Sequence, residues 1–419
     1  MALCAVLRDA GLRVRAYKSG PDYIDARLYA SILGEPAHNL DLWLDGQDGV
    51  LRHIAASAGD ADVVLIEGMM GLFDGDNAGT TSTARLAQTL DASVLTILDA
   101  SKASQTVAAV GLGLRLFEPE LRHVGAIVNR VGGASHVAAL SAACSRVGIE
   151  VLAAIPRREH YVLPERRLGL DRAAFTQRAA VVVEQLAHEL AAQLDIPALV
   201  AAAAARPLDR YAPPNSRAQR ARIAYAEDGA FWFTYPETLD ALRMAGAELI
   251  TFSPLHDTEL PRDIDALWIG GGYPEDHGPA LSANQTLRTE IHEAIAGGMP
   301  AYAECGGLMY LAQTLHTASG SHAMVGAIGG ATSMAEPKLH LGYREATVAT
   351  ESPLDALGTR IRAHEFHYAT SMLTPGAPAY VCASAHEGIV QANCVASFFH
   401  RHFLPGDLAI DRFVAAAAA

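Results

Sequence analysis

The chain has 419 residues, half of them hydrophobic, which is long enough for two or three globular domains. Its 32 basic and 46 acidic residues give a net charge of −14, which argues against a general nucleic-acid or anionic-membrane surface. The sequence shows neither the pattern of a signal peptide nor an uncharged apolar run of about 18 residues. It therefore predicts a cytoplasmic protein without nucleic-acid or membrane partners.

Short apolar runs alternate with amphipathic helical segments through the first half of the chain, which is typical of a doubly wound parallel α/β sheet. An amphipathic helix is expected at 104–117. The expected strands of this half are 13–17, 63–67, 93–98, 123–128 and 151–155.

A change of composition predicts where the first domain ends. From residue 194 the chain becomes alanine-rich and then proline-containing, which indicates a linker. The predicted organisation is a first domain at 1–193, a linker at 194–220 and a second α/β domain at 221–419. Within the second domain we expect a helix at 236–245 and strands at 222–226, 249–252, 266–269 and 301–304.

A loop after the strand at 13–17 carries the sequence KSGPDYID, with one lysine and two carboxylates. Such a loop suits phosphate or metal binding, although Gly-Pro-Asp is also ordinary turn chemistry. The strand at 63–67 ends at Glu67, at the edge of an α/β sheet that commonly binds ligands. Asp41 and Glu67 could together hold a magnesium ion between nucleotide phosphates, but Asp41 could equally cap a helix at 42–44.

Two arginine pairs stand out in an acidic protein: Arg157 with Arg158, and Arg166 with Arg167. They could clamp substrate carboxylates, or they could form a solvated basic loop.

The strand at 301–304 is followed by Cys305, two glycines and a helical run. A cysteine on such a sharp turn is exposed above the sheet, lies at the positive end of the helix and can act as a nucleophile. The strand at 266–269 ends in three glycines, so backbone N–H groups of Gly271 and Gly272, with that of Gly306, could form an oxyanion hole.

A lone cysteine is more often a small buried apolar residue, but a histidine-rich segment at 397–403 supplies a candidate base, and the combination favours catalysis. The five cysteines are scattered and unpaired in spacing, so neither a disulfide framework nor a zinc site is expected.

The joint pattern KSGPDYID, HNLDLWL, EGMMGLFDG, IPRREHYVLPERRLGL, GGGYPE, AECGGLMYL and HEFHY resembles the corrinoid a,c-diamide synthases, glutamine-dependent amidotransferases of cobalamin biosynthesis. The resemblance implies a dethiobiotin-synthetase-like domain of the P-loop type, which uses ATP and Mg²⁺ to phosphorylate a substrate carboxylate. It also implies a flavodoxin-like class I glutaminase domain that releases ammonia. The implied substrates are cobyrinate or hydrogenobyrinate, glutamine and ATP, and whether the chain forms a homodimer stays open.

By the same resemblance, Cys305 is expected to form the glutamyl thioester, His400 to act as its base, and Lys18 to bind phosphate. In related class I glutaminases a glutamate two positions after this histidine orients it; here that position is His402, so the residue that orients His400 is open. HEFHY does not have the i, i+4 histidine spacing of a helical zinc motif. Substrate contacts are expected from Asp22, Tyr23, Asp25, Asp74, His364 and His367.

The start of the chain departs from the family pattern. Family members open with a strand and a Walker-type loop, whereas this sequence contains no Gly-Lys-Thr or Gly-Lys-Ser and begins within the following helix. Without that loop ATP binding is expected to fail and two sheet edges to be exposed. A misplaced start is favoured over a truncated copy, because the remaining motifs are intact.

Two other functions are compatible with the pattern. One is a glutaminase-only or tetrapyrrole-binding protein that has lost ATP chemistry, and the other is a nickel-sirohydrochlorin a,c-diamide synthase. Cobyric acid synthase is set aside, because it carries an Asn-rich segment where this chain has Pro21 to Asp25.

Overall fold

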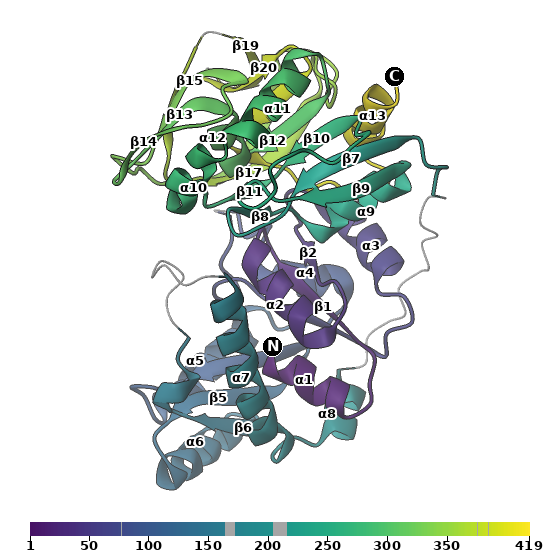
Figure 1. Cartoon of the computed structure of the whole chain (residues 1–419). Helices are drawn as coiled ribbons and strands as arrows, with labels where there is room; N and C mark the ends of the chain where they lie inside the picture. Colours follow the sequence, from purple (N-terminus) through teal and green to yellow (C-terminus); the bar gives the residue numbers. More distant parts are fainter. Residues whose placement is uncertain (77, 164–171, 204–215, 375, 384) are drawn as a thin grey trace. The chain divides into compact units, whose positions relative to one another are not determined.

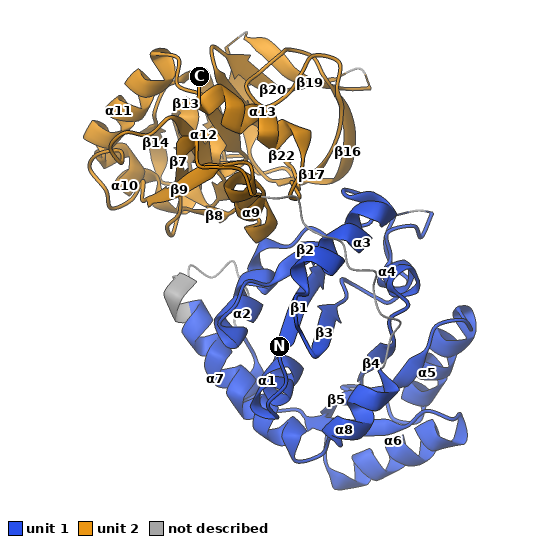
Figure 2. Cartoon of the chain, turned by 90° about the vertical axis from the view of Figure 1, so that its right-hand side faces the viewer, with its two compact units in different colours: residues 1–211 blue, residues 212–419 orange. Residues whose placement is uncertain are grey.

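The computed structural model describes residues 1–76, 78–163, 172–203, 216–374, 376–383 and 385–419. The chain divides into two compact units, Met1–Tyr211 and Ala212–Ala419 (Figure 2). Among the described residues, no helix is both long and apolar enough to cross a membrane.

All five strands expected in the first unit form, but together with one strand that was not expected, β2, they make two parallel sheets of three strands (Figure 1). One has the order β2-β1-β3 and the other β4-β5-β6, and within the described residues no ladder joins them. The single doubly wound sheet expected for this half is thus divided between β3 and β4. The strands are β1 (Val14–Ser19), β2 (His38–Leu40), β3 (Val63–Glu67), β4 (Val94–Asp99), β5 (His123–Val131) and β6 (Val151–Pro156).

Helix α1 (Ala2–Asp9) is apolar on two sides and packs with both sheets. Cys4 and Leu7 contact the cluster that contains Val14 of β1, whereas Ala5 and Val6 pack with the cluster that contains Ile127 of β5. The other helical elements are α2 (Tyr23–Leu33), α3 (Gly46–Ser57), α4 (Thr83–Leu90), α5 (Thr106–Phe117), α6 (Ala134–Arg146), η1 (Glu159–Tyr161) and α7 (Arg172–Ala191).

Part of the range predicted to be a linker is helical. Helix α8 (Ile196–Ala202) begins after Asp195, whose side chain accepts a hydrogen bond from the backbone N–H of Ala198 and so caps the helix. Ile196 and Val200 pack against the core that contains Cys4 and Leu7. Residues 196–202 therefore belong to the first unit by packing, and residues 204–215 of the predicted linker lie outside the described residues.

The second unit is built on a ten-stranded mixed sheet of order β22-β17-β16-β19-β20-β21-β12-β10-β7-β9. Strands β9, β7, β10, β12 and β21 run parallel, and the remaining ladders are antiparallel. Their bounds are β7 (Ala221–Ala226), β9 (Ala247–Phe252), β10 (Ala266–Ile269), β12 (Ala301–Glu304), β16 (His340–Val348), β17 (Arg360–His367), β19 (Ala377–Cys382), β20 (Ala385–Gln391), β21 (Cys394–Ser397) and β22 (Phe399–His400).

Smaller sheets flank it. One pairs β8 (Phe231–Phe233) with β11 (Gly271–Gly272), and the other has the order β14-β13-β15-β18. The strands of the second are β13 (Ala312–Thr317), β14 (Gly320–Ala323), β15 (Ile328–Ser333) and β18 (Thr370–Leu373).

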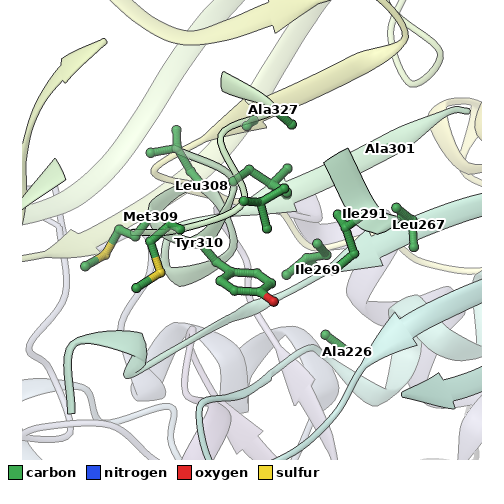
Figure 3. Packing of buried hydrophobic residues seen from close by; sticks show 14 of the residues in the cluster. Ala226, Leu267, Ile269, Ile291, Ala301, Leu308, Met309, Tyr310 and Ala327 are labelled. Carbon is green, nitrogen blue, oxygen red and sulfur yellow. The ribbon is translucent and has the colours of Figure 1, made fainter. Parts of the chain in front are cut away.

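Alternate residues of the parallel strands enter two different cores, one on each face of the sheet. Leu267 and Ile269 of β10 pack with helices α10 (Gly278–Ala283), α11 (Gln285–Ala296) and α12 (Gly306–Leu311), around Tyr310 (Figure 3). Trp268 of β10 faces the other way, toward α9 (Pro236–Met244) and α13 (Leu408–Ala417). Helices on both faces hold β12 in the middle of the unit, where its last residues lead into the site.

Replacement of Gly307 by alanine is expected to destabilise the second unit. A Cβ atom at this position would lie 2.2 Å from the carbonyl oxygen of Ile269, a backbone atom that cannot swing away. Overpacking of this kind costs about 1–3 kcal/mol, more than the gain of about 1 kcal/mol that alanine brings to a helix.

Urea unfolding followed by tryptophan fluorescence, to which the buried Trp268 contributes, would measure the effect. The matched control is Gly229→Ala, whose Cβ would meet its nearest atom, Cδ1 of Leu255, at an ordinary 3.5 Å. Equal unfolding midpoints for the two variants would show that the approach of α12 to β10 is not tight.

Candidate active site

Cys305 lies between β12, which ends at Glu304, and α12, which begins at Gly306. Its backbone has φ 48° and ψ −102°, outside the left-handed region that L-residues tolerate. The backbone N–H of Cys305 donates to the carbonyl of Ser397 at 2.7 Å, which ties the turn to the neighbouring strand β21. This is the sharp strand-to-helix turn predicted for a nucleophile, and the side chain is 7% exposed.

The glycines predicted to form an oxyanion hole gather around this turn. A Cβ atom on Gly306 would lie 2.9 Å from the backbone nitrogen of Gly272, and one on Gly271 would lie 2.9 Å from Cε1 of His400. Gly272 has φ 157°, and a Cβ there would overlap the carbonyl of Ala230. Gly306 opens α12, so its N–H has no acceptor within the helix and is suited to an oxyanion.

His400 is fully buried and forms a hydrogen bond with Cys305. Burial lowers the pKa of His400, but the negative charges of the Cys305 thiolate and of Glu304 outweigh burial and raise it to about 10. The structure thus brings the predicted nucleophile and base into hydrogen-bond contact, the arrangement in which a histidine can activate a cysteine.

Glu304 is a site residue that the sequence reasoning missed. Its Oε2 lies 3.7 Å from Nδ1 of His400, while its Oε1 accepts hydrogen bonds from the hydroxyl of Tyr302 at 2.5 Å and the backbone N–H of Arg401 at 3.1 Å. The available signal was a charged residue at the end of an otherwise apolar buried strand, directly before the cysteine.

His402 points elsewhere. Its Nε2 lies 3.1 Å from Oε1 of Glu237 on α9, and its ring packs edge-on against Tyr235 at 4.8 Å. Both side chains of the ion pair are buried. His402 is therefore paired away from Cys305, and of the two histidines His400 is the one at the thiol.

His364 and His367 lie on β17, next to β22. His364 is the ladder partner of His400, and burial together with the charge of His400 lowers the pKa of His364 to about 3, so it is neutral near pH 7. His367 stacks on Phe398 with ring centroids 4.0 Å apart. Both residues expected to contact substrate thus border the strand that carries the base.

His367 also belongs to a cluster of three metal-ligand types, with Glu365 and His340. Its Nε2 lies 3.0 Å from Oε1 of Glu365, and Arg344 binds the other oxygen of that carboxylate at 2.7 Å. The imidazole planes of His340 and His367 are parallel to within 3°, so their in-plane lone pairs do not converge on one ion. The cluster is an ion-pair network in this conformation.

In the first unit, Lys18 is buried and surrounded by acceptors. Its ammonium lies 3.1 Å from Oδ2 of Asp25, 3.1 Å from Oε1 of Glu67 and 3.2 Å from the carbonyl of Gly68. Burial lowers the pKa of Lys18, but the charges of Glu67 and Asp25 outweigh burial and raise it. The hydroxyl of Tyr29 donates to the other oxygen of Glu67. Three of the predicted residues are therefore brought together, and all three ammonium protons of Lys18 have acceptors.

Other predicted carboxylates act in local turns. Oδ1 of Asp22 accepts the N–H groups of Ile24 and Asp25 and caps α2, which Tyr23 opens. Oδ1 of Asp41 accepts the N–H groups of Trp43 and Leu44. This oxygen therefore caps the segment at 42–44, which is a turn and not the expected helix. Oδ2 of Asp74 accepts the N–H of Gly71.

Asp41 follows β2 and Glu67 ends β3, and these strands lie on opposite sides of β1, so both carboxylates are at the same edge of the sheet. Of the arginine pairs, Arg158 forms an ion pair with Glu189 at 2.9 Å, and Arg166 and Arg167 lie outside the described residues.

Two families match the chain. Residues 222–408 match the CobB/CobQ-like glutamine amidotransferase domain, and residues 1–168 match the CobQ/CobB/MinD/ParA nucleotide binding domain. A cobyrinate a,c-diamide synthase of Syntrophotalea carbinolica is 38% identical over 96% of this chain and 92% of that protein. Hydrogenobyrinate a,c-diamide synthases of Mycobacterium bovis and Rhodobacter capsulatus are 38% and 37% identical, over 99% and 96% of this chain and 94% of each relative.

Proposed function

The chain belongs to the cobyrinate and hydrogenobyrinate a,c-diamide synthases, glutamine-dependent amidating ligases of cobalamin biosynthesis, and from that premise we propose which of its residues perform each half of the reaction. The enzyme converts the a and c carboxylates of the corrinoid to carboxamides, with ATP to activate each carboxylate and glutamine as the source of nitrogen. The observation that carries the assignment is the hydrogen-bonded contact of Cys305 with His400 beside the glycine loop.

In the glutaminase half, the Cys305 thiolate attacks the carboxamide carbon of glutamine, and the carbonyl π electrons move onto oxygen. Backbone N–H groups of Gly272 and Gly306, with Gly271 beside them, stabilise that oxyanion. His400 donates its proton to the departing nitrogen, which leaves as ammonia, and then removes a proton from the water that hydrolyses the thioester to glutamate. The catalytic residues are thus Cys305 and His400.

In the ligase half, ATP transfers a phosphoryl group to the corrinoid carboxylate, and ammonia displaces the phosphate to leave an amide. Asp41 and Glu67 would hold the magnesium ion, since both offer carboxylate oxygens, the donors that Mg²⁺ prefers. These carboxylates would have to bind the ion and keep their present partners. Oδ1 of Asp41 accepts two N–H groups, and the two oxygens of Glu67 contact Lys18 and Tyr29. A carboxylate has about four lone-pair sites on its two oxygens, more than these contacts occupy, so an ion can be added to them. The bound ion would neutralise phosphate charge.

The other expected contacts remain part of the proposal. We assign phosphate binding to Lys18 and corrinoid binding to Asp22, Tyr23, Asp25, Asp74, His364 and His367. For Lys18 this requires a phosphate oxygen to replace one of its three present acceptors.

The test of the function is the corrinoid product. Incubation of a form of the protein that carries a Walker-type loop with ATP, Mg²⁺, glutamine and either cobyrinate or hydrogenobyrinate should yield the diamide, with ADP and glutamate released as each amide forms. Turnover of neither corrinoid, alongside amidation of nickel-sirohydrochlorin, would assign the chain to another substrate.

In a form of the protein that carries a Walker-type loop, Glu67→Gln and Asp41→Asn are expected to reduce magnesium-dependent ATP turnover by at least about tenfold, the scale seen when groups that tune a metal site are changed. Glutamine hydrolysis at Cys305 should be unaffected, because these residues lie in the other unit. ADP release at varied Mg²⁺ concentration measures the effect, with Asp60→Asn on the exposed surface as the control. An unchanged requirement for Mg²⁺ in both variants would remove these residues from the metal site.

A further inference from the structure

We propose that Glu304 is the positioning residue for His400, and that this chain therefore completes a Cys-His-Glu triad with the glutamate that directly precedes its nucleophile. The inference rests on the proposed roles of Cys305 and His400. It concerns the residue that orients His400. In related class I glutaminases this residue lies two positions after the histidine, and that position is His402 in this chain.

The first step of the argument is the placement of Glu304 relative to the imidazole. Oε2 of Glu304 lies 3.7 Å from Nδ1 of His400, and their side chains are 4% and 3% exposed. With Nδ1 facing the carboxylate, Nε2 is the nitrogen left for the thiol. Catalytic hydrogen bonds are often long before substrate binds and shorten in the complex, so 3.7 Å is compatible with a working contact.

The second step is that the Glu304 carboxylate is itself fixed. Tyr302 and the backbone N–H of Arg401 both donate to Oε1, which turns Oε2 toward His400. Burial, and then the charge of Glu304, raise the pKa of Tyr302 well above its usual range, so its hydroxyl stays protonated and remains a donor. The carboxylate is thus oriented by two donors that do not belong to the reacting groups.

The third step is that Arg401, which follows the base, is anchored independently. Its guanidinium forms two contacts with Asp355, at 2.8 and 2.7 Å, and Tyr380 donates to the same carboxylate at 3.0 Å. Because Arg401 adjoins His400, this buried pair fixes β22 in the register that places the imidazole between Glu304 and Cys305.

The alternative triad member is excluded by the same geometry. In the position that follows His400 by two residues, His402 contacts Glu237 instead of the base. Two buried glutamates therefore each face a histidine of this segment, and only Glu304 faces the histidine at the thiol.

Alkylation of Cys305 by iodoacetamide across a range of pH tests the proposal, because it reads the thiolate directly and needs neither ATP nor corrinoid. Glu304→Gln keeps an oxygen that can accept from Tyr302 and Arg401 but removes the charge that favours the imidazolium. The thiolate fraction near pH 7 should fall, and the alkylation rate at that pH should drop about tenfold for each unit by which the midpoint of the alkylation profile rises above it. The rate at pH values high enough to ionise the thiol fully in both proteins should be unchanged. The kcat for glutamine should fall with little change in KM.

The matched control is Glu237→Gln, a second buried glutamate beside a histidine, which should leave the alkylation profile of Cys305 unchanged. A shift in Glu237→Gln with none in Glu304→Gln would overturn the proposal in favour of the His402 pair. Loss of the rate at every pH in Glu304→Gln would also overturn it, because that result signals a purely structural role. Failure of the underlying function has a separate signature, namely undiminished glutamine hydrolysis in Cys305→Ser.

Discussion

In a form of the protein that carries a Walker-type loop, Cys305→Ser is expected to abolish glutamine-dependent amidation while ammonia-dependent amidation persists. The serine hydroxyl is a far weaker nucleophile than a thiolate paired with an imidazolium, so no acyl-enzyme forms from glutamine. The ATP-dependent half lies in the other unit, which can still accept ammonia supplied from solution. Glutamate release and corrinoid amide formation, measured with glutamine and then with an ammonium salt, separate the two halves.

The control for Cys305→Ser is Cys394→Ser, since Cys394 is fully buried on β21 and burial raises its pKa to about 12, so it is not ionised at neutral pH. This variant should use glutamine normally if it folds. Glutamine hydrolysis that survives in Cys305→Ser would mean that another residue attacks the substrate.

His400→Ala is expected to lower glutamine hydrolysis by about 10²–10⁴-fold, the usual contribution of a general acid–base residue. The loss has two physical sources. The thiolate loses the imidazolium that stabilises it, and the departing nitrogen loses its proton donor. Initial rates of glutamate release at saturating glutamine measure the effect, and ammonia-dependent amidation should again be retained.

His402→Gln provides the comparison for His400→Ala, because it changes a buried histidine of the same segment that contacts Glu237 and not the thiol. We expect its effect on kcat to be small. If His402→Gln were inactive and His400→Ala active, the base would have been assigned to the wrong histidine.

Elements with one strong local signal were predictable from the sequence. Strands β3 and β10 are uninterrupted apolar runs, and their bounds in the structure agree with the predicted ones. The turn at Cys305 was predictable because two glycines follow the cysteine. In the structure each of these glycines lies too close to backbone atoms to carry a side chain. These features depend on residues that are neighbours in the chain.

Features that depend on tertiary packing were not predicted. Helix α8 lies in an alanine-rich stretch whose composition suits a linker equally well. Its packing on α1 is what makes it part of the first unit. The antiparallel strands β16 and β17 carry charged residues on both faces, so a search for apolar alternation did not reveal them. Glu304 is next to Cys305 in sequence, yet its role depends on Nδ1 of a histidine nearly a hundred residues later.

The backbone at Cys305 has a consequence for how stability and activity trade against each other in this protein. A non-glycine residue at φ 48° and ψ −102° costs about 1–3 kcal/mol, which the surrounding strands and helix must offset. Glycine would relieve that cost and remove the thiol in the same change. Selection for thermal stability alone would therefore favour loss of the nucleophile, and a stabilised descendant of this chain has to gain its stability at other positions.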